Sequence, residues 1–299
     1  MIIDVFNHFM PKSIFERLLW DVEARLRMMD EFEGLQQVLS LANPPIEMLG
    51  PSEKTPELAR IANDGLAELC RKYPDRFPAF IASMPMNNVD ACVREADRAI
   101  VELGAKGIQI FTNVLGRPLS APEFRPIFRN MVKHDLPVWI HPIRGPQFSD
   151  YASEKASENE IWFTFGWPYE TTACVTRLIF SGIYFYAGKI DLGFDQIFHG
   201  RTNENPMARR AGLKKRPVEY YRMLYGDTAL NGSVAATRCG HAFFTTGHCV
   251  FATDAPFDAE KGRMLIRETI NAVNGLEIPK AEKDRIFAGN ARALLKLNG

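Results

Sequence analysis

The first 140 residues alternate between short apolar segments and longer segments with helical periodicity. The apolar segments, which we predict as strands, cover residues 2–6, 37–42, 79–84, 107–111 and 137–141. The segments between them, which we predict as helices, cover residues 13–32, 55–73, 89–103 and 122–133, with Ser13 as the first cap. Strands separated by helices form parallel sheets through right-handed crossovers, and both faces of such sheets are buried. The pattern therefore predicts an α/β fold with a parallel sheet.

The rest of the chain continues the pattern less regularly, and we treat residues 1–299 as a single domain. Further helices are predicted over 169–180, 218–224, 262–274 and 280–297, with strands near 226–230 and 249–253 and a further candidate strand at 183–186. One domain of this length suits a (β/α)8 barrel of the TIM type. The alternative is a doubly wound open sheet, which normally carries a phosphate-binding loop after its first strand. Neither GxGxxG nor GxxxxGK[ST] occurs in the sequence.

Charge and cysteine content narrow the classes of partner and the compartment. The 36 Lys and Arg residues equal the 36 Asp and Glu residues, so the chain lacks the basic excess that nucleic acids and anionic membranes attract. The five cysteines form no CxxC pair, which favours a reduced compartment. The first ten residues do not resemble a secretion signal, and no long apolar run follows. We therefore predict a cytoplasmic protein that binds neither nucleic acid nor membrane.

Three residues that close predicted strands are candidates for chemistry. His8 follows the first strand, His141 closes the strand at 137–141, and Asp254 follows the last strand. Active sites of β/α barrels lie at these strand ends, and two imidazoles with a carboxylate suit a divalent ion such as zinc. A single histidine at a strand end is more often a hydrogen-bonded core residue than a metal ligand, so the case for a metal depends on all three residues together. Structural roles are expected for the other histidines, His134, His199, His241 and His248.

Arg144 and a group of aromatic residues follow His141 in the sequence. Arg144 suits either a bidentate clamp for a substrate carboxylate or an ion pair at the surface, and the sequence leaves both open. The aromatic group, which suits either a pocket wall or a packed loop or subunit interface, is Trp162, Phe163, Phe165, Trp167 and Tyr169.

Seven motifs, spread over nearly the whole chain, resemble one known family. They are IDVFNHFMP, YPDRFPAF, GAKGIQI, LPVWIHP, TRLIFSG, VFATDAPFD and IFAGNARALLKL. In this order they resemble the amidohydrolase-related decarboxylase family of aminocarboxymuconate-semialdehyde decarboxylase. The resemblance implies a distorted β/α barrel, one divalent metal (zinc, with manganese as the alternative) and a homodimer. It also implies non-oxidative decarboxylation of a small aromatic or unsaturated carboxylic acid, with hydratases and hydrolases as related activities.

The chain departs from this family at two places. The family opens with Asp-x-His-x-His, both histidines binding the metal, whereas this chain has Phe6 and His8 at those positions. The resemblance makes His141 a metal ligand and Asp254 a ligand or proton carrier. The HHxGG-type turn that carries the family's proton-transfer histidine is absent, which implies that sequence near Ile183 is missing and that strand six is lost or replaced.

Two hypotheses follow. In the first, His8, His141 and Asp254 hold the metal, Arg144 orients the acid, and Asp254 or a water delivers the proton during decarboxylation. In the second, the chain is a catalytically impaired member of the family that acts as a binding or assembly partner. Hydration or hydrolysis at the same metal is a further alternative.

Overall fold

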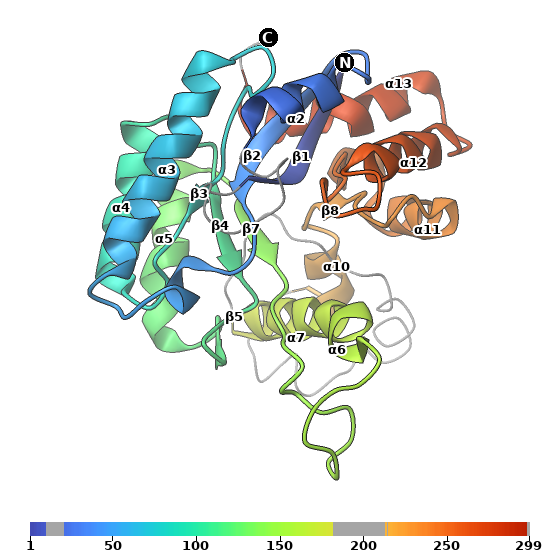
Figure 1. Ribbon diagram of the computed structural model, residues 1–299. Coiled ribbons are helices and arrows are strands. Elements are labelled where there is room, and N and C mark those ends of the chain that lie inside the picture. Colours follow the sequence, from blue (N-terminus) through green and yellow to red (C-terminus); the bar gives the residue numbers. More distant parts are fainter. Residues whose placement is uncertain (10–20, 182–212, 214, 298–299) are drawn as a thin grey trace.

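Parallel strands form the centre of the molecule, and helices surround them (Figure 1). The computed structural model describes residues 1–9, 21–181, 213 and 215–297. The parallel strands in this part of the chain are β1 (Ile2–Phe9), β2 (Leu35–Leu41), β3 (Ala82–Ser83), β4 (Ile108–Phe111), β7 (Val138–His141), β8 (Gly226–Asp227) and β9 (Cys249–Val250). A small antiparallel hairpin joins β5 (Asn113–Val114) to β6 (Arg117–Pro118). These observations confirm the α/β class.

The parallel strands follow one another in chain order. β1 pairs with β2, β3 with β4, β4 with β7, and β8 with β9. A parallel bridge between Leu39 and Phe80 joins β2 to the β3 segment, and Val5 N donates to Phe251 O at 3.0 Å, which joins β1 to the β9 segment. The resulting order β8-β9-β1-β2-β3-β4-β7 is that of consecutive strands in a β/α barrel. The candidate strand at 183–186 lies outside the described residues.

Helices cover the outer face of the strands because each presents an apolar stripe to them. The first are α2 (Val22–Met29), α3 (Thr55–Lys72), α4 (Val89–Val101) and α5 (Arg125–His134), with short 3₁₀ turns η1 (Ile46–Met48) and η2 (Pro122–Phe124). Buried residues between them and the strands include Leu66, Ala96, Ile108 and Ile127. A separate cluster joins side chains from five of the strand segments, Val5, Val38, Ile81, Trp139 and Val250. Both faces of the strands are therefore apolar, as parallel sheets require.

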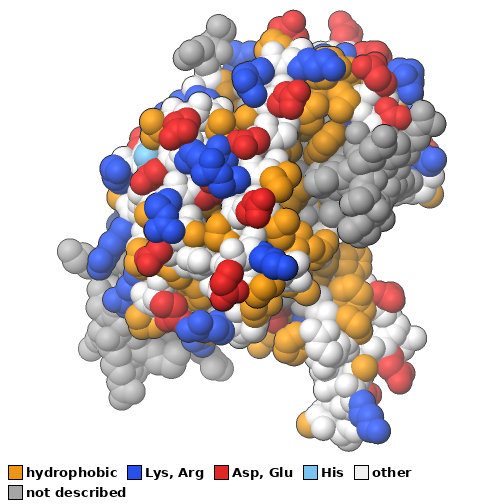
Figure 2. All heavy atoms as spheres, turned by 60° about the vertical axis from the view of Figure 1, so that its left-hand side comes forward, with side chains coloured by type: hydrophobic (Ala, Val, Ile, Leu, Met, Phe, Trp, Pro, Cys, Tyr) orange, Lys and Arg blue, Asp and Glu red, His pale blue; other side chains and the backbone are white. Residues whose placement is uncertain are grey.

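The second half of the chain contributes mainly helices. They are α6 (Ile161–Thr164), α7 (Gly166–Phe180), α10 (Pro217–Tyr221), α11 (Val234–Phe244) and α12 (Arg263–Asn274), with the 3₁₀ turn η3 (Thr246–His248). None of the helices in the described part of the chain is long and apolar enough to span a membrane. On the face shown in Figure 2, acidic and basic side chains are interspersed without a continuous basic area.

Several predicted bounds are wrong. The first described helix begins at Val22 with Asp21 as its cap, accepting from Ala24 N at 2.9 Å, so Ser13 does not cap it; residues 10–20 lie outside the description. The predicted helix at 280–297 is three pieces: α13 (Lys280–Asp284), the π-helix η4 (Arg285–Gly289) and α14 (Asn290–Leu294). A π-helix usually occurs as a single turn inside an α-helix, so it falls within a segment that is predicted as one continuous helix. The strands predicted near 226–230 and 249–253 contain only two residues each.

Candidate functional site

Strand β1 brings His8 to the carboxyl end of the sheet, where it meets Asp254. The register of β1 against β2 shifts between Asp4 and Asn7, so a bulge precedes His8. The His8 side chain is buried, and its Nε2 lies 2.8 Å from Asp254 Oδ1. Asp254 has a φ of 64°, a left-handed conformation that costs a non-glycine residue free energy and is common at functional sites. The structure thus brings together two of the three residues singled out as metal ligands.

His141 closes β7 beside this pair. The ring centroids of His8 and His141 are 5.5 Å apart. His141 Nδ1 donates to Pro142 O at 2.6 Å, which assigns the proton of the neutral ring to Nδ1 and leaves Nε2 as the nitrogen with a lone pair. Metal-binding histidines usually make such a hydrogen bond through the nitrogen that does not bind the metal. His141 therefore has the tautomer of a ligand.

Phe6 occupies the space beside both imidazoles. Its ring centroid lies 4.8 Å from that of His8, edge to face, and 5.4 Å from that of His141, stacked. Phe111, Trp167 and Phe257 complete the aromatic surroundings, with Phe111 4.9 Å and Trp167 5.4 Å from His141, and Phe257 5.3 Å from His8. Apolar rings exclude water from polar chemistry, but a phenyl ring donates no electron pair to a metal.

The donor types fit a divalent metal, although they do not form a closed site as they stand. Imidazole nitrogens and a carboxylate oxygen are ordinary ligands for zinc and manganese. Within the described residues, no three His, Cys, Asp or Glu side chains are grouped closely enough to hold a metal ion. His8 Nδ1 is also buried without a hydrogen-bond partner. Binding would therefore require His8 or its neighbours to adjust.

Arg144 lies beyond β7 and forms an ion pair. Its Nη1 is 2.9 Å from Glu170 Oε1, and both side chains are 19% exposed. The guanidinium also lies over the rings of Phe148 and Tyr169, at 4.8 and 5.8 Å. Arg144 therefore forms an ion pair, which was one of its two predicted roles, but the pair is half-buried and does not lie at the surface. Arg144 still lines a pocket of about 750 Å³ together with Met48, Ile143, Phe148 and Trp162.

A buried arginine, which the sequence analysis did not single out, holds the end of β1. Arg25 on α2 is 1% exposed, and its Nη1 donates to His8 O. Its Nη2 donates to Asn7 Oδ1, and its Nε donates to Gln37 Oε1 at 2.8 Å. The sequence did contain a sign that Arg25 is buried. Arg25 lies three residues after Val22 and four before Met29, which places it on the apolar stripe of the helix.

Asp4 is the acidic partner in this network and links β1 to the segment that carries Asp254. Its Oδ2 accepts from Gln37 Nε2 at 3.0 Å and from Thr253 Oγ1 at 2.7 Å, and its Oδ1 accepts from Thr253 N at 3.1 Å. Burial raises the pKa of Asp4 to about 6, and burial lowers the pKa of Arg25 to about 10. The network fixes the backbone on both sides of the His8–Asp254 contact.

The other residues considered from the sequence have structural contacts or lie outside the description. His134 Nε2 pairs with Asp97 Oδ1 at 2.5 Å, and His241 Nε2 lies 2.9 Å from Thr246 Oγ1. His248 Nδ1 donates to Leu224 O at 3.0 Å, and His199 lies outside the described residues. Of the aromatic group, Trp167 reaches His141, Trp162 lines the pocket, and the other three are Phe163, Phe165 and Tyr169, all exposed.

Known proteins resemble this chain over almost its whole length. Gamma-resorcylate decarboxylase of Rhizobium radiobacter is 29% identical over 311 residues, covering 96% of this chain and 91% of that protein. The crystal structure of 2,6-dihydroxybenzoate decarboxylase from Rhizobium has a TM-score of 0.79 and 24% identity, covering 100% of this chain and 99% of that one. Dihydroxybenzoic acid decarboxylase from Polaromonas, solved with manganese and the inhibitor 2-nitroresorcinol, has a TM-score of 0.77 and 22% identity, covering 100% and 97%.

The solved structures show the fold. The curated relatives are decarboxylases, and two of them, gamma-resorcylate decarboxylase and 6-methylsalicylic acid decarboxylase, are named for small aromatic acids. Residues 3–184 match the family described as amidohydrolase, which is more than half of the 299 residues. This chain therefore belongs to the amidohydrolase family.

Proposed function

We propose that this protein is a metal-dependent non-oxidative decarboxylase of a small aromatic carboxylic acid. The observation that supports it most is the juxtaposition of His8, Asp254 and His141 at one end of the sheet, in a chain whose full-length relatives are decarboxylases. His8, His141 and Asp254 would hold the metal, with zinc or manganese as candidates because a related structure contains manganese. A bound divalent ion would act as a Lewis acid toward the substrate oxygens. A cytoplasmic homodimer is part of the proposal.

The residues of the chain supply the proton chemistry. Asp254, whose Oδ1 lies 2.8 Å from His8 Nε2, would deliver a proton to the ring carbon that bears the carboxylate. The bond between that carbon and the carboxylate then breaks, its electron pair returns to the ring, and carbon dioxide leaves. The rings of Phe6 and Trp167 pack against His141, and that of Phe257 packs against His8, so the surroundings of this step are partly apolar. One proton is consumed for each carbon dioxide released.

The metal content of the purified protein tests this proposal. We expect protein purified without chelator or metal-affinity resin to hold close to one zinc or manganese ion per chain, and His141→Ala to lose it. His134→Ala is the matched control, because His134 pairs with Asp97 on the helical layer away from the site. Metal-loaded protein should release carbon dioxide from at least one aromatic acid. A folded protein that binds no metal and releases none would contradict the proposal.

Arg144 gives a second test, on substrate binding. The pocket it lines, about 750 Å³, is of the size that holds a small organic ligand. We expect Arg144→Met to raise KM by about 10- to 100-fold, because a charged hydrogen bond contributes about 1.5–3 kcal/mol. Glu170→Gln, which removes the competing carboxylate, should leave KM unchanged or lower it. If both variants raise KM equally, Arg144 only shapes the loop.

One observation favours the second candidate function, an impaired member that binds partners or acids without turnover. Phe6 stands where the family places a ligand, and its ring packs on both imidazoles. Loss of a ligand together with the proton-transfer histidine lowers rates by orders of magnitude. The same metal measurement separates the two candidates, because the impaired protein would fold normally but contain no metal.

A further inference from the structure

The pocket that Arg144 lines is larger than a small aromatic acid requires. Its volume is about 750 Å³, in the upper half of the range for ligand pockets, about 300–1,000 Å³. A hydroxybenzoic acid has roughly ten non-hydrogen atoms, which would fill less than half of the pocket even at the roughly 30 Å³ that a water molecule occupies in the liquid. The pocket therefore has room for a substituent on the ring.

Exposed apolar side chains from three separate segments gather in this pocket. They are Met48, Leu115 and Phe148, which are 56%, 59% and 42% exposed. Single exposed apolar side chains are ordinary, whereas several that surround one hollow are typical of a surface that binds an apolar group. Ile143 and Trp162 add to the apolar lining.

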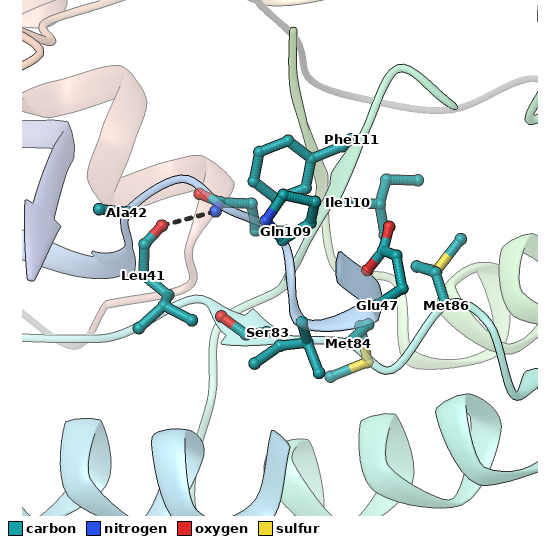
Figure 3. A pocket seen from close by; sticks show the side chains of 11 residues that line it. Leu41, Ala42, Glu47, Ser83, Met84, Met86, Gln109, Ile110 and Phe111 are labelled. Atoms are coloured by element: carbon teal, nitrogen blue, oxygen red, sulfur yellow. Dashed lines mark hydrogen bonds between the residues drawn. The ribbon is translucent and has the colours of Figure 1, made fainter. Parts of the chain in front are cut away.

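The turn that carries Met48 is anchored to the sheet. The other two residues of η1, Ile46 and Glu47, are each 3% exposed. Figure 3 shows the inner side of this turn, where Glu47 lies beside Ile110 of β4. Met48 N also donates to Pro45 O at 3.0 Å. The exposure of Met48 is therefore a property of a fixed wall of the pocket.

Leu115 occupies a turn position that leucine disfavours. The two-residue turn Leu115–Gly116 joins β5 to β6, and its φ angles are 50° and 85°. Positive φ at both residues is the pattern of a type I′ turn, in which asparagine, aspartate or glycine normally comes first. Leucine there costs conformational free energy, and a side chain that is 59% exposed recovers little of it by burial. Contact with an apolar ligand explains this leucine better than folding does.

Arg144 supplies the charged end of the same pocket. Its Nη1 donates to Glu170 Oε1, and no other nitrogen of the guanidinium donates to a described residue, so donors remain for a carboxylate. Trp167 joins this end to the candidate metal residues. Its Nε1 donates to Arg144 O at 3.1 Å, and its ring centroid lies 5.4 Å from that of His141.

We propose that the acid bound in this pocket carries an apolar substituent of several carbons, which lies on Met48, Leu115 and Phe148 while Arg144 binds the carboxylate. The inference rests on the decarboxylase function proposed above, which identifies the ligand as an aromatic acid. One cation and a set of exposed apolar side chains around a single hollow match the two ends of such an amphipathic acid.

The affinity for two series of acids tests the proposal. The 4-alkylbenzoates and the 6-alkylsalicylates, each with methyl, propyl and pentyl chains, place the substituent opposite the carboxylate and beside it. We expect the Kd from titration calorimetry to fall by about two- to four-fold for each added methylene in at least one series, the range for half to full burial of a CH₂ group. The titrations are made on both metal-loaded and metal-free protein, because binding does not require turnover.

Leu115→Asn is the most informative variant, because it should weaken binding of long chains and stabilise the fold. Asparagine suits the first position of the turn, so Tm should rise, while the gain in affinity per methylene should fall. Ile61→Asn, the matched control on α3, also changes a side chain that is 59% exposed and should leave that gain unchanged. Arg144→Met should weaken every member of a series by the same factor.

The proposal is overturned if neither series gains affinity with chain length, or if Leu115→Asn and Ile61→Asn give the same gain. It is also overturned if chain length has no effect and Leu115→Asn dissociates a dimer in analytical ultracentrifugation, since the pocket would then be an interface between copies of the chain. A protein that prefers long chains but holds no metal and releases no carbon dioxide would support this inference and contradict the decarboxylase function.

Discussion

Replacing Arg25 with methionine should lower the free energy of unfolding by about 3–5 kcal/mol, the usual cost of leaving a buried charge without compensation. Methionine fills much of the arginine volume but donates no hydrogen bond. The substitution leaves His8 O, Asn7 Oδ1 and Gln37 Oε1 without their donor in a fully buried region. Asp4 also loses its nearby positive charge.

The destabilisation by Arg25→Met should depend on pH with a definite sign. The pKa of Asp4 is already raised to about 6 by burial, and loss of the arginine raises it further. The folded variant must therefore bind a proton more tightly, so the loss of stability should be larger at pH 8 than at pH 5. Urea denaturation at both pH values measures it.

Two further variants separate this network from general effects of removing an arginine. Arg76→Met breaks a pair with Asp30 in which the side chains are 28% and 61% exposed, and should cost less than about 1 kcal/mol. If Arg25→Met does not fold, the double variant with Asp4→Asn should recover part of the stability, because the buried charge is gone. If Arg25→Met and Arg76→Met lower the free energy of unfolding by the same amount, the buried network adds no more stability than an exposed ion pair.

The sequence was most informative where local pattern and burial agree. Periodicity predicted the helices at 55–73 and 89–103 to within two residues of α3 and α4. The strands at 107–111 and 137–141 were equally clear, because a strand buried on both faces is apolar throughout. The convergence of His8 with Asp254 followed from the rule that barrel strands present their carboxyl ends to the same side.

The rest depended on interactions between residues far apart in the chain. The buried role of Arg25 needs Gln37 and the end of β1, and no local pattern specifies them. Arg144 was left open between a clamp and an ion pair, since the position of Glu170 was unknown. The π-helix at Arg285–Gly289 has no sequence signal in the apolar period.

Phe6→His should raise the affinity for zinc or manganese by more than about 100-fold. Residues that only support a metal ligand change metal affinity by about 10- to 100-fold, and a direct ligand should have a larger effect. The Phe6 ring centroid lies 4.8 and 5.4 Å from the centroids of His8 and His141, so an imidazole there would face both. The new imidazole would add one nitrogen ligand. Without it, no three His, Cys, Asp or Glu side chains in the described residues are grouped closely enough to hold a metal ion. Titration calorimetry on protein stripped of metal measures the change.

The gain must come from the new nitrogen and not from removal of the phenyl ring. Phe6→Leu removes the ring and supplies no ligand, so its affinity should stay near that of the wild type. In the double variant with His141→Ala, the gain in affinity should largely disappear. The new imidazole would then lack His141 as a second ligand, whose ring is oriented by the hydrogen bond from its Nδ1 to Pro142 O. If Phe6→His binds metal no better than Phe6→Leu, then His8, His141 and Asp254 do not converge on this position, and the decarboxylase proposal loses its metal centre.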